Sequence, residues 1–174
     1  RFLILLILLF VYTIICAFSY VNAVSSNIES SVFRLHVIAN SDSKEDQDLK
    51  YIVRDNILKY INDISPDMYI SIHLNASPSP SWRGLQVFYT GNNKENKIIA
   101  ETITNHLKEN ISNVREIKKD NTYYMYKHIK SPGVLIEAGF ISNPNDNYLL
   151  RDVNYQNKLV TLISDSIEKY YQNK

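Results

Sequence analysis

The apolar positions of the first half of the chain change their spacing along its length. Residues 31–40 form a mostly apolar run typical of a buried strand, and residues 68–74 return to that pattern. Between them, residues 43–62 carry apolar side chains three and four positions apart, which predicts a helix. Ser43 and Asp46 resemble a capping box at the start of this helix. A strand, a helix and a second strand in this order predict a parallel pair.

The second half of the chain continues the alternation. Residues 75–83 contain two prolines and three serines, which predicts a surface loop at the end of a strand. A strand is expected over 85–90, a helix over 95–111, a buried strand over 133–137 and a closing helix over 159–170. The fold class predicted is α/β, a three-layer sheet with helices on both faces. Ligands are expected beyond the carboxyl ends of its strands.

The amino terminus is the most apolar part of the chain. In residues 2–18, Thr13 is the one clearly polar residue, and this length lies between a secretory signal and a full membrane span. A signal peptide and a membrane anchor, each a hydrophobic helix in residues 1–23, therefore both remain open. Residues 21–23 resemble a signal peptidase site and favour cleavage. Because Arg1 precedes the run, we expect the rest of the chain to be extracytoplasmic, secreted or anchored.

Composition and charge narrow the function classes. The chain has 174 residues, of which 45 % are hydrophobic, enough for one packed domain with a short appendage. Its 19 basic and 18 acidic side chains offer no basic surplus, so we expect no nucleic-acid partner. The single cysteine, Cys16, lies in the apolar run. A disulfide framework is thereby excluded, and any metal must be held by histidine and carboxylate. Since the first residue is not Met, we expect the sequence to lie within a longer reading frame.

Two residues at strand ends are candidates for chemistry. His73 closes an apolar strand, and Glu137 follows three buried apolar residues. Neutral imidazole and carboxylate around an open coordination position are the groups that zinc hydrolases use. Burial would raise the pKa of Glu137 unless a cation lies nearby. The alternative is a hydrogen-bonded core histidine and a structural acid.

The sequence around these two residues resembles a known family. Residues 70–76 (ISIHLNA) and 135–143 (LIEAGFISN) are similar to the two downstream motifs of the zinc-dependent N-acetylmuramoyl-L-alanine amidases, in particular the spore-cortex type. The resemblance covers residues 66–174, including the Pro-Ser-Pro loop and Trp82.

This resemblance implies a function and roles for single residues. His73 would be a zinc ligand and Glu137 the catalytic carboxylate, and Asn75 and Arg115 would bind substrate. The substrate would be peptidoglycan, cut between N-acetylmuramic acid and L-alanine. The family's first zinc histidine loop and its ligand glutamate have no counterpart in the chain. We therefore expect a truncated amidase-like fold that lacks its N-terminal part, with an incomplete Zn²⁺ site.

The preceding segment resembles a different family. Residues 33–42, with further matches through residue 55, are similar to the opening of stage II sporulation protein R, and this resemblance covers residues 2–62. That family consists of secreted sporulation signals. The predicted organisation is a signal or anchor (1–23), a segment like the sporulation signal (24–62) and an amidase-like catalytic domain (66–174).

Three functions follow from these resemblances. The first is an amidase of sporulation or cortex maturation, impaired unless His36, an acidic side chain or a partner protein completes the zinc site. The second is an inactive cell-wall-binding module that uses the loop of Trp82, and the third is a secreted sporulation signal. The partners expected are peptidoglycan, the membrane through residues 2–18, and a sporulation protein.

Overall fold

The structure of the chain is a computed structural model that describes residues 6, 7, 9–19 and 39–174. It contains two compact units, residues 1–40 and 41–174. In the first unit, residues 6, 7 and 9–19 are helical and expose their side chains. None of the helices in the described residues combines the length and the hydropathy that a membrane crossing requires. Most of the predicted strand 31–40 lies outside the described residues.

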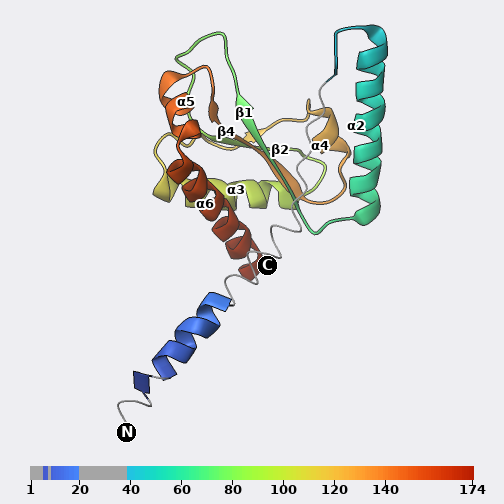
Figure 1. The fold of residues 1–174 in the computed structure, drawn as a ribbon. Coiled ribbons are helices and arrows are strands. Elements are labelled where there is room, and N and C mark those ends of the chain that lie inside the picture. The colour runs from blue at the N-terminus through green and yellow to red at the C-terminus, as the bar shows by residue number, and fades with distance from the viewer. Residues whose placement is uncertain (1–5, 8, 20–38) are drawn as a thin grey trace. The chain divides into compact units, whose positions relative to one another are not determined.

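The second unit is built on a four-stranded sheet in the order β1-β4-β2-β3 (Figure 1). Strand β1 (Tyr69–Asn75) pairs parallel with β4 (Gly133–Phe140), and β2 (Gln86–Tyr89) pairs antiparallel with β4. The short β3 (Lys118–Lys119) runs parallel to β2. No helix separates β1 from β2, so the chain turns back through a loop and β2 enters the sheet in the opposite direction.

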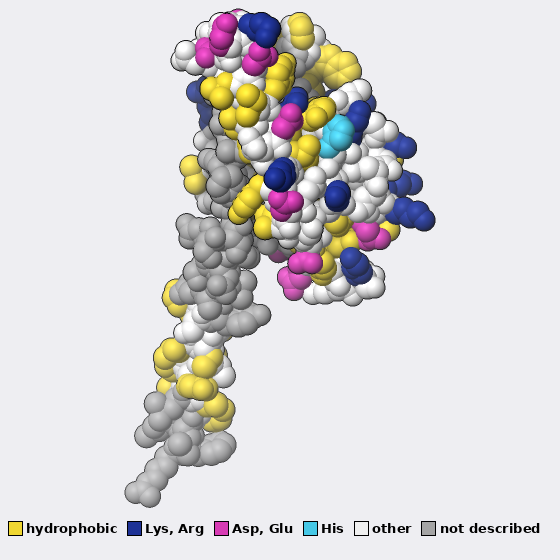
Figure 2. Space-filling view, turned by 90° about the vertical axis from the view of Figure 1, so that its right-hand side faces the viewer, with side chains coloured by type: hydrophobic (Ala, Val, Ile, Leu, Met, Phe, Trp, Pro, Cys, Tyr) yellow, Lys and Arg dark blue, Asp and Glu magenta, His cyan; other side chains and the backbone are white. Residues whose placement is uncertain are grey.

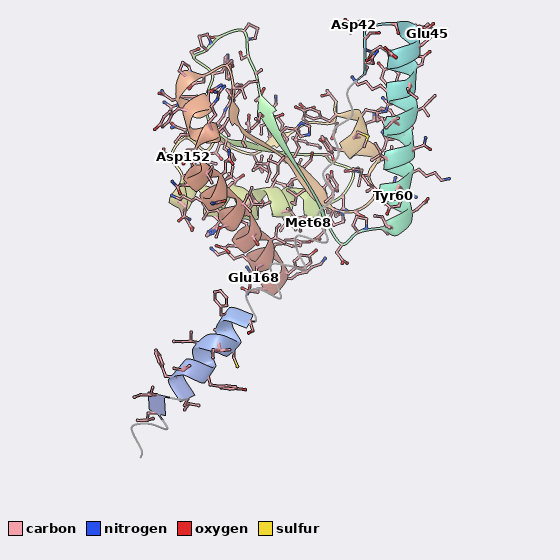
Figure 3. All side chains as sticks on the ribbon, in the orientation of Figure 1. Asp42, Glu45, Tyr60, Met68, Asp152 and Glu168 are labelled. Atoms are coloured by element: carbon pink, nitrogen blue, oxygen red, sulfur yellow. The ribbon has the colours of Figure 1, made fainter. Side chains whose placement is uncertain are left out.

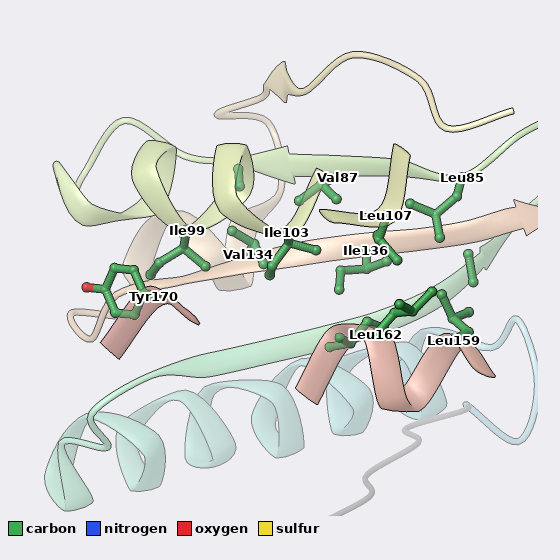
Figure 4. Close-up of a cluster of buried hydrophobic side chains, with 13 residues drawn as sticks. Leu85, Val87, Ile99, Ile103, Leu107, Val134, Ile136, Leu159, Leu162 and Tyr170 are labelled. Carbon is green, nitrogen blue, oxygen red and sulfur yellow. The ribbon is translucent and has the colours of Figure 1, made fainter. Parts of the chain in front are cut away.

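One face of the sheet, here called the core face, carries the main hydrophobic core. Helices α3 (Glu95–Asn110) and α6 (Val153–Gln172) pack against each other, and α3 packs on β2 and β4 (Figure 4). Helix α5 (Pro144–Arg151) packs against β4 and α6. The buried side chains of this core include Leu85, Val87, Ile99, Ile103, Leu107, Val134, Ile136, Leu159 and Leu162. Their burial supplies the main stabilisation of the domain.

The opposite face of the sheet, here called the site face, carries a smaller aromatic layer. Helix α4 (Tyr124–His128) covers it, and the Tyr123 ring, just before α4, meets Phe88 edge to face with centroids 6.0 Å apart. Helix α2 (Lys44–Ile64) contacts α4. The predicted α/β class, with helices on both faces of a sheet, is confirmed.

Helix α2 follows the prediction for residues 43–62 closely. The Ser43 side chain accepts a hydrogen bond from the Asp46 backbone N–H at 3.2 Å, as a capping residue does. Figure 3 shows Asp42 and Glu45 at this end of the helix and Tyr60 toward the other. The helix buries no residue completely, and hydrophobic side chains reach the surface on this side of the unit (Figure 2).

Candidate functional site

The pairing of β1 with β4 brings the two predicted chemical residues together. His73 and Glu137 are register partners in adjacent parallel strands. Partners in a sheet present their side chains on the same face, so both belong to the site face, whereas Ile72 and Ile136 belong to the core face. An imidazole and a carboxylate from segments more than 60 residues apart are therefore neighbours near the carboxyl ends of two strands.

Glu137 is a buried carboxylate without an ion-pair partner among the described residues. Its residue is 8 % exposed, and its Oε2 atom is buried with no hydrogen-bond partner in the described part of the chain. Burial raises the pKa of this carboxyl, as the sequence predicted for a site with no cation nearby. A carboxylate with a raised pKa is suited to accept and return a proton near neutral pH.

Two hydroxyl groups hold the ring of His73. Its Nε2 atom lies 3.0 Å from Ser71 Oγ and 3.0 Å from Tyr126 Oη, and these two oxygens lie 2.8 Å from each other. Ser71 precedes His73 by two residues and so shares its face, while Tyr126 comes from α4. The ring of Tyr126 stacks on Tyr69 with centroids 6.0 Å apart. The exposed imidazole is thus held by a hydrogen-bonded set that β1 and α4 supply.

The electrostatics place the tyrosines of this layer near Glu137. Burial raises the pKa of Tyr126, and the charge of Glu137 raises it further, while the Ser71 hydrogen bond lowers it. Burial raises the pKa of Tyr123 as well, and Glu137 is its second cause. Both phenols therefore stay protonated beside the carboxylate. Neither these two tyrosines nor Ser71 were among the site residues predicted from the sequence.

A β-bulge extends the site face beyond Glu137. The register between β1 and β4 shifts after His73, so that Asn75 pairs with Phe140. Since Asn75 follows His73 by two residues, Phe140 lies on the same face as Glu137 although it is three residues further along β4. Gly139 has a φ of +153° in this bulge, a backbone conformation that favours glycine.

The loop that follows β1, which the sequence predicted over residues 75–83, is hydrogen-bonded to residues that follow β4. The Ser77 backbone N–H donates to Ser142 Oγ at 3.0 Å, and Asn143 Nδ2 donates to the carbonyl oxygen of Pro80 at 2.7 Å. The Gly84 backbone N–H donates to Oδ2 of the buried Asp146 at 2.7 Å. These three bonds fix the loop beside the site.

The fixed loop presents Trp82 to Arg115 and Phe140. The Arg115 guanidinium carbon lies 4.9 Å from the centroid of the Trp82 ring and 5.8 Å from that of Phe140. Trp82 remains 50 % exposed. Asn75 accepts a hydrogen bond from the Ala76 backbone N–H at its side chain and one from the Ile141 N–H at its carbonyl, each at 2.8 Å. Both predicted substrate-binding residues thus lie at the end of the sheet that carries His73 and Glu137.

The described residues do not complete a metal centre. No group of three or more histidine, cysteine, aspartate or glutamate side chains in the described ranges could hold a metal ion. His106 of α3 bonds Lys169 of α6, and His128 is an exposed residue of α4 whose Nδ1 lies 2.7 Å from the Tyr124 carbonyl oxygen. His73 and Glu137 alone are too few donors for a zinc site. His36 lies outside the described residues.

The fold and the site together define a layered α/β domain with a histidine and a buried glutamate at the end of a parallel strand pair. The family model described as N-acetylmuramoyl-L-alanine amidase matches residues 16–169. The chain belongs to this family. The match includes residues 24–62, whose resemblance to the sporulation signal stays a prediction.

Individual relatives agree with this assignment. The chain is 41 % identical over 118 residues to the germination-specific N-acetylmuramoyl-L-alanine amidase of Bacillus subtilis, covering 67 % of this chain and 50 % of that protein. The solved structure of the CwlD amidase from Clostridioides difficile in complex with the GerS lipoprotein superposes with a TM-score of 0.69 at 31 % identity, over 78 % of this chain and 68 % of that one. The chain therefore spans about half the length of the germination-specific relative.

Proposed function

We propose that this chain hydrolyses the amide between N-acetylmuramic acid and L-alanine in peptidoglycan, during sporulation or cortex maturation. The observation that carries the proposal is the pairing of His73 with Glu137, whose buried Oε2 has no partner among the described residues. Family membership and the similarity to the germination-specific amidase support the reaction and the setting. The substrate lies outside the cytoplasmic membrane, so the proposed location is extracytoplasmic, with residues 2–18 as signal or anchor.

Glu137 is the proposed catalytic residue. Its carboxylate takes a proton from the attacking water as the water oxygen bonds to the amide carbon, and then gives that proton to the nitrogen of L-alanine as the carbon–nitrogen bond breaks. The products are a carboxylic acid on the muramic acid and a free amine on the peptide. The raised pKa supports this double role, because it makes the carboxylate a stronger base toward the attacking water and keeps the protonated form populated closer to neutral pH.

His73 is the proposed metal ligand, and zinc is the proposed cofactor. The family is generally zinc-dependent. The described donors do not complete the site, so every step above is assigned to this chain's own residues. Further donors would come from His36, from an acidic side chain or from a partner protein. A protein partner is also proposed from the CwlD relative, which was solved with the GerS lipoprotein.

Asn75 and Arg115 are the proposed substrate-binding residues. Asn75 is the last residue of β1, and the Arg115 guanidinium lies beside Phe140, the last residue of β4, at the sheet edge where bound substrates are expected in α/β sheets. The second candidate function, a wall-binding module without activity, is favoured by the half-exposed Trp82 on a fixed loop. The signalling function depends on residues 24–62 and is proposed third.

The amidase function is tested by Glu137→Gln in the full chain incubated with muramoyl peptides. The release of free amine should fall by about a factor of 100 or more, because general acid–base groups contribute about that much. Glu168→Gln, a change at an exposed site on α6, should leave the rate unaltered. Equal rates for the Glu137 variant and the unmodified chain would contradict the proposal. Sedimentation with peptidoglycan without release of amine would favour the wall-binding function.

A further inference from the structure

We propose that Arg115 is a carboxylate receptor that selects muramoyl peptides with a free carboxylate in the peptide stem. This inference rests on the proposed function, and it names the part of the substrate that the site recognises. Its basis is the environment of the guanidinium group, which holds a positive charge on the site face with no acceptor supplied to it by the described residues.

The position of Arg115 follows from the bulge between β1 and β4. Because of the bulge, the Phe140 side chain lies on the same face of the sheet as Glu137, and the Arg115 guanidinium lies over the Phe140 ring. The backbone of Arg115 is fixed independently of its side chain, because its N–H donates to the Leu85 carbonyl oxygen at 2.8 Å. The positive charge is therefore built into the wall of the site next to the end of β4.

The contacts of the Arg115 side chain are aromatic. Within the described ranges, it has neither an ion pair nor a hydrogen bond, and its contacts are the rings of Trp82 and Phe140. Arg54, by comparison, donates to Asp55 Oδ1 at 2.8 Å, and Arg83 has its Nε 4.0 Å from Asp146 Oδ1. A guanidinium carries five N–H donors in a fork that matches a carboxylate. Arg115 therefore retains the donors that a bound carboxylate requires.

The side chain of Arg115 is already ordered in the structure. Stacking on two rings limits the motion of the side chain, and Trp82 belongs to the loop that Ser142, Asn143 and Asp146 hold in place. A receptor ordered before binding loses little conformational entropy when the ligand arrives.

The occupant that this chemistry fits is a carboxylate of the peptide stem. The stem begins at the L-alanine whose amide is cut, and its next residue is a glutamate in muramoyl dipeptides, so a carboxylate follows closely on the reacting bond. A sugar ring stacked on the exposed Trp82 is a different recognition mode, and it would not distinguish charged from neutral peptides.

Binding of two ligands to the Glu137→Gln full chain tests the inference without turnover. The ligands are N-acetylmuramoyl-L-alanyl-D-glutamate with both glutamate carboxylates free, and the same molecule with both carboxylates amidated. Calorimetry should give about tenfold tighter binding of the free acid, in keeping with a charge-assisted hydrogen-bonded pair that is partly solvated. Adding Arg115→Gln should abolish this preference, and Arg115→Lys should restore part of it, because the charge remains without the fork. The control Arg151→Gln, on α5, should keep the full preference.

Several results would overturn the inference. One is that the Glu137→Gln chain binds both ligands equally tightly, or binds neither. Another is that the preference for the free acid survives Arg115→Gln. A third is that Arg115→Gln lowers the affinity for both ligands by the same factor. Weakening of both ligands by Trp82→Leu, with no effect of Arg115→Gln, would assign the subsite to a sugar instead. Failure of the proposed function looks different, because amine release would then be absent while the charge preference remained.

Discussion

The carboxyl of Glu137 is buried on β4, where function and stability oppose each other. Its pKa is raised by burial, so the folded state favours the protonated form. For an acid of this kind, the contribution to stability is present below the unfolded-state pKa and is lost as the pH rises through the folded-state pKa. Above the folded-state pKa, the charged, buried group therefore destabilises the fold.

Replacing Glu137 by Gln should consequently raise the free energy of unfolding while it removes activity. The gain expected at about pH 7 is about 1 kcal/mol, the scale of an unpaired buried polar group. It should shrink toward about pH 4, because the native carboxyl then becomes neutral as well. Urea unfolding at several pH values measures the gain, with Glu168→Gln as the matched control. A gain independent of pH, or a loss at neutral pH, would speak against a charged Glu137 in a desolvated site.

Sequence alone predicted part of this site. His73 and Glu137 could be found because each follows a run of apolar residues, and the carboxyl ends of parallel strands meet at one edge of an α/β sheet. In the structure both strands continue past these residues, β1 to Asn75 and β4 to Phe140. Ser71 and Tyr126 could not be assigned to His73 in the same way. The Tyr126 contact depends on how a five-residue helix docks on the sheet, which is a tertiary effect without a periodic signal.

At the scale of the elements, the pairing of β1 with β4 decides whether the site exists. This pairing depends on close approach at Gly133, where a Cβ atom would collide with the Tyr69 carbonyl oxygen and ring. Asn96 of α3 also holds the backbone at Gly133, since its Oδ1 accepts a hydrogen bond from the Gly133 N–H at 2.8 Å. The register of His73 with Glu137 is thus set four residues before the site.

Gly133→Ala should lower the free energy of unfolding by about 2 kcal/mol or more, the scale of overpacking against fixed backbone. It should also reduce amine release, because displacement of β1 separates His73 from Glu137. Gly91→Ala is the matched control. Its Cβ would meet the flexible end of Lys119, with Cε at 2.7 Å, which can move aside at little cost. Thermal unfolding of both variants provides the measurement, and equal stability of the two would argue against the β1–β4 register.

The elements with long periodic patterns were those that the sequence predicted. Helices α2, α3 and α6 and strands β1, β2 and β4 all overlap their predicted ranges. Helices α4 and α5 and strand β3 were not predicted, because each has at most eight residues and shows too few apolar repeats. The antiparallel direction of β2 was also missed. It follows from the course of the loop, which a pattern of apolar residues does not record.

At the scale of the whole molecule, the described residues supply too few donors to complete a metal site with His73. The chain has four histidines. His106 is hydrogen-bonded to Lys169, and His128 is exposed on α4. Completion of a zinc site therefore requires His36, a further carboxylate or another protein.

The zinc content of the purified full chain measures that completion. Catalytic zinc sites have three protein ligands, so a site with fewer should bind zinc far more weakly. We expect less than one zinc per chain after dialysis, and we expect His73→Ala to remove what remains. His128→Ala should change nothing, because that ring is exposed and bonded within α4. Zinc that survives His73→Ala would place the metal elsewhere in the chain. One tightly held zinc that is lost in both His73→Ala and His36→Ala would contradict the expected weak binding and show that residues before α2 complete the centre.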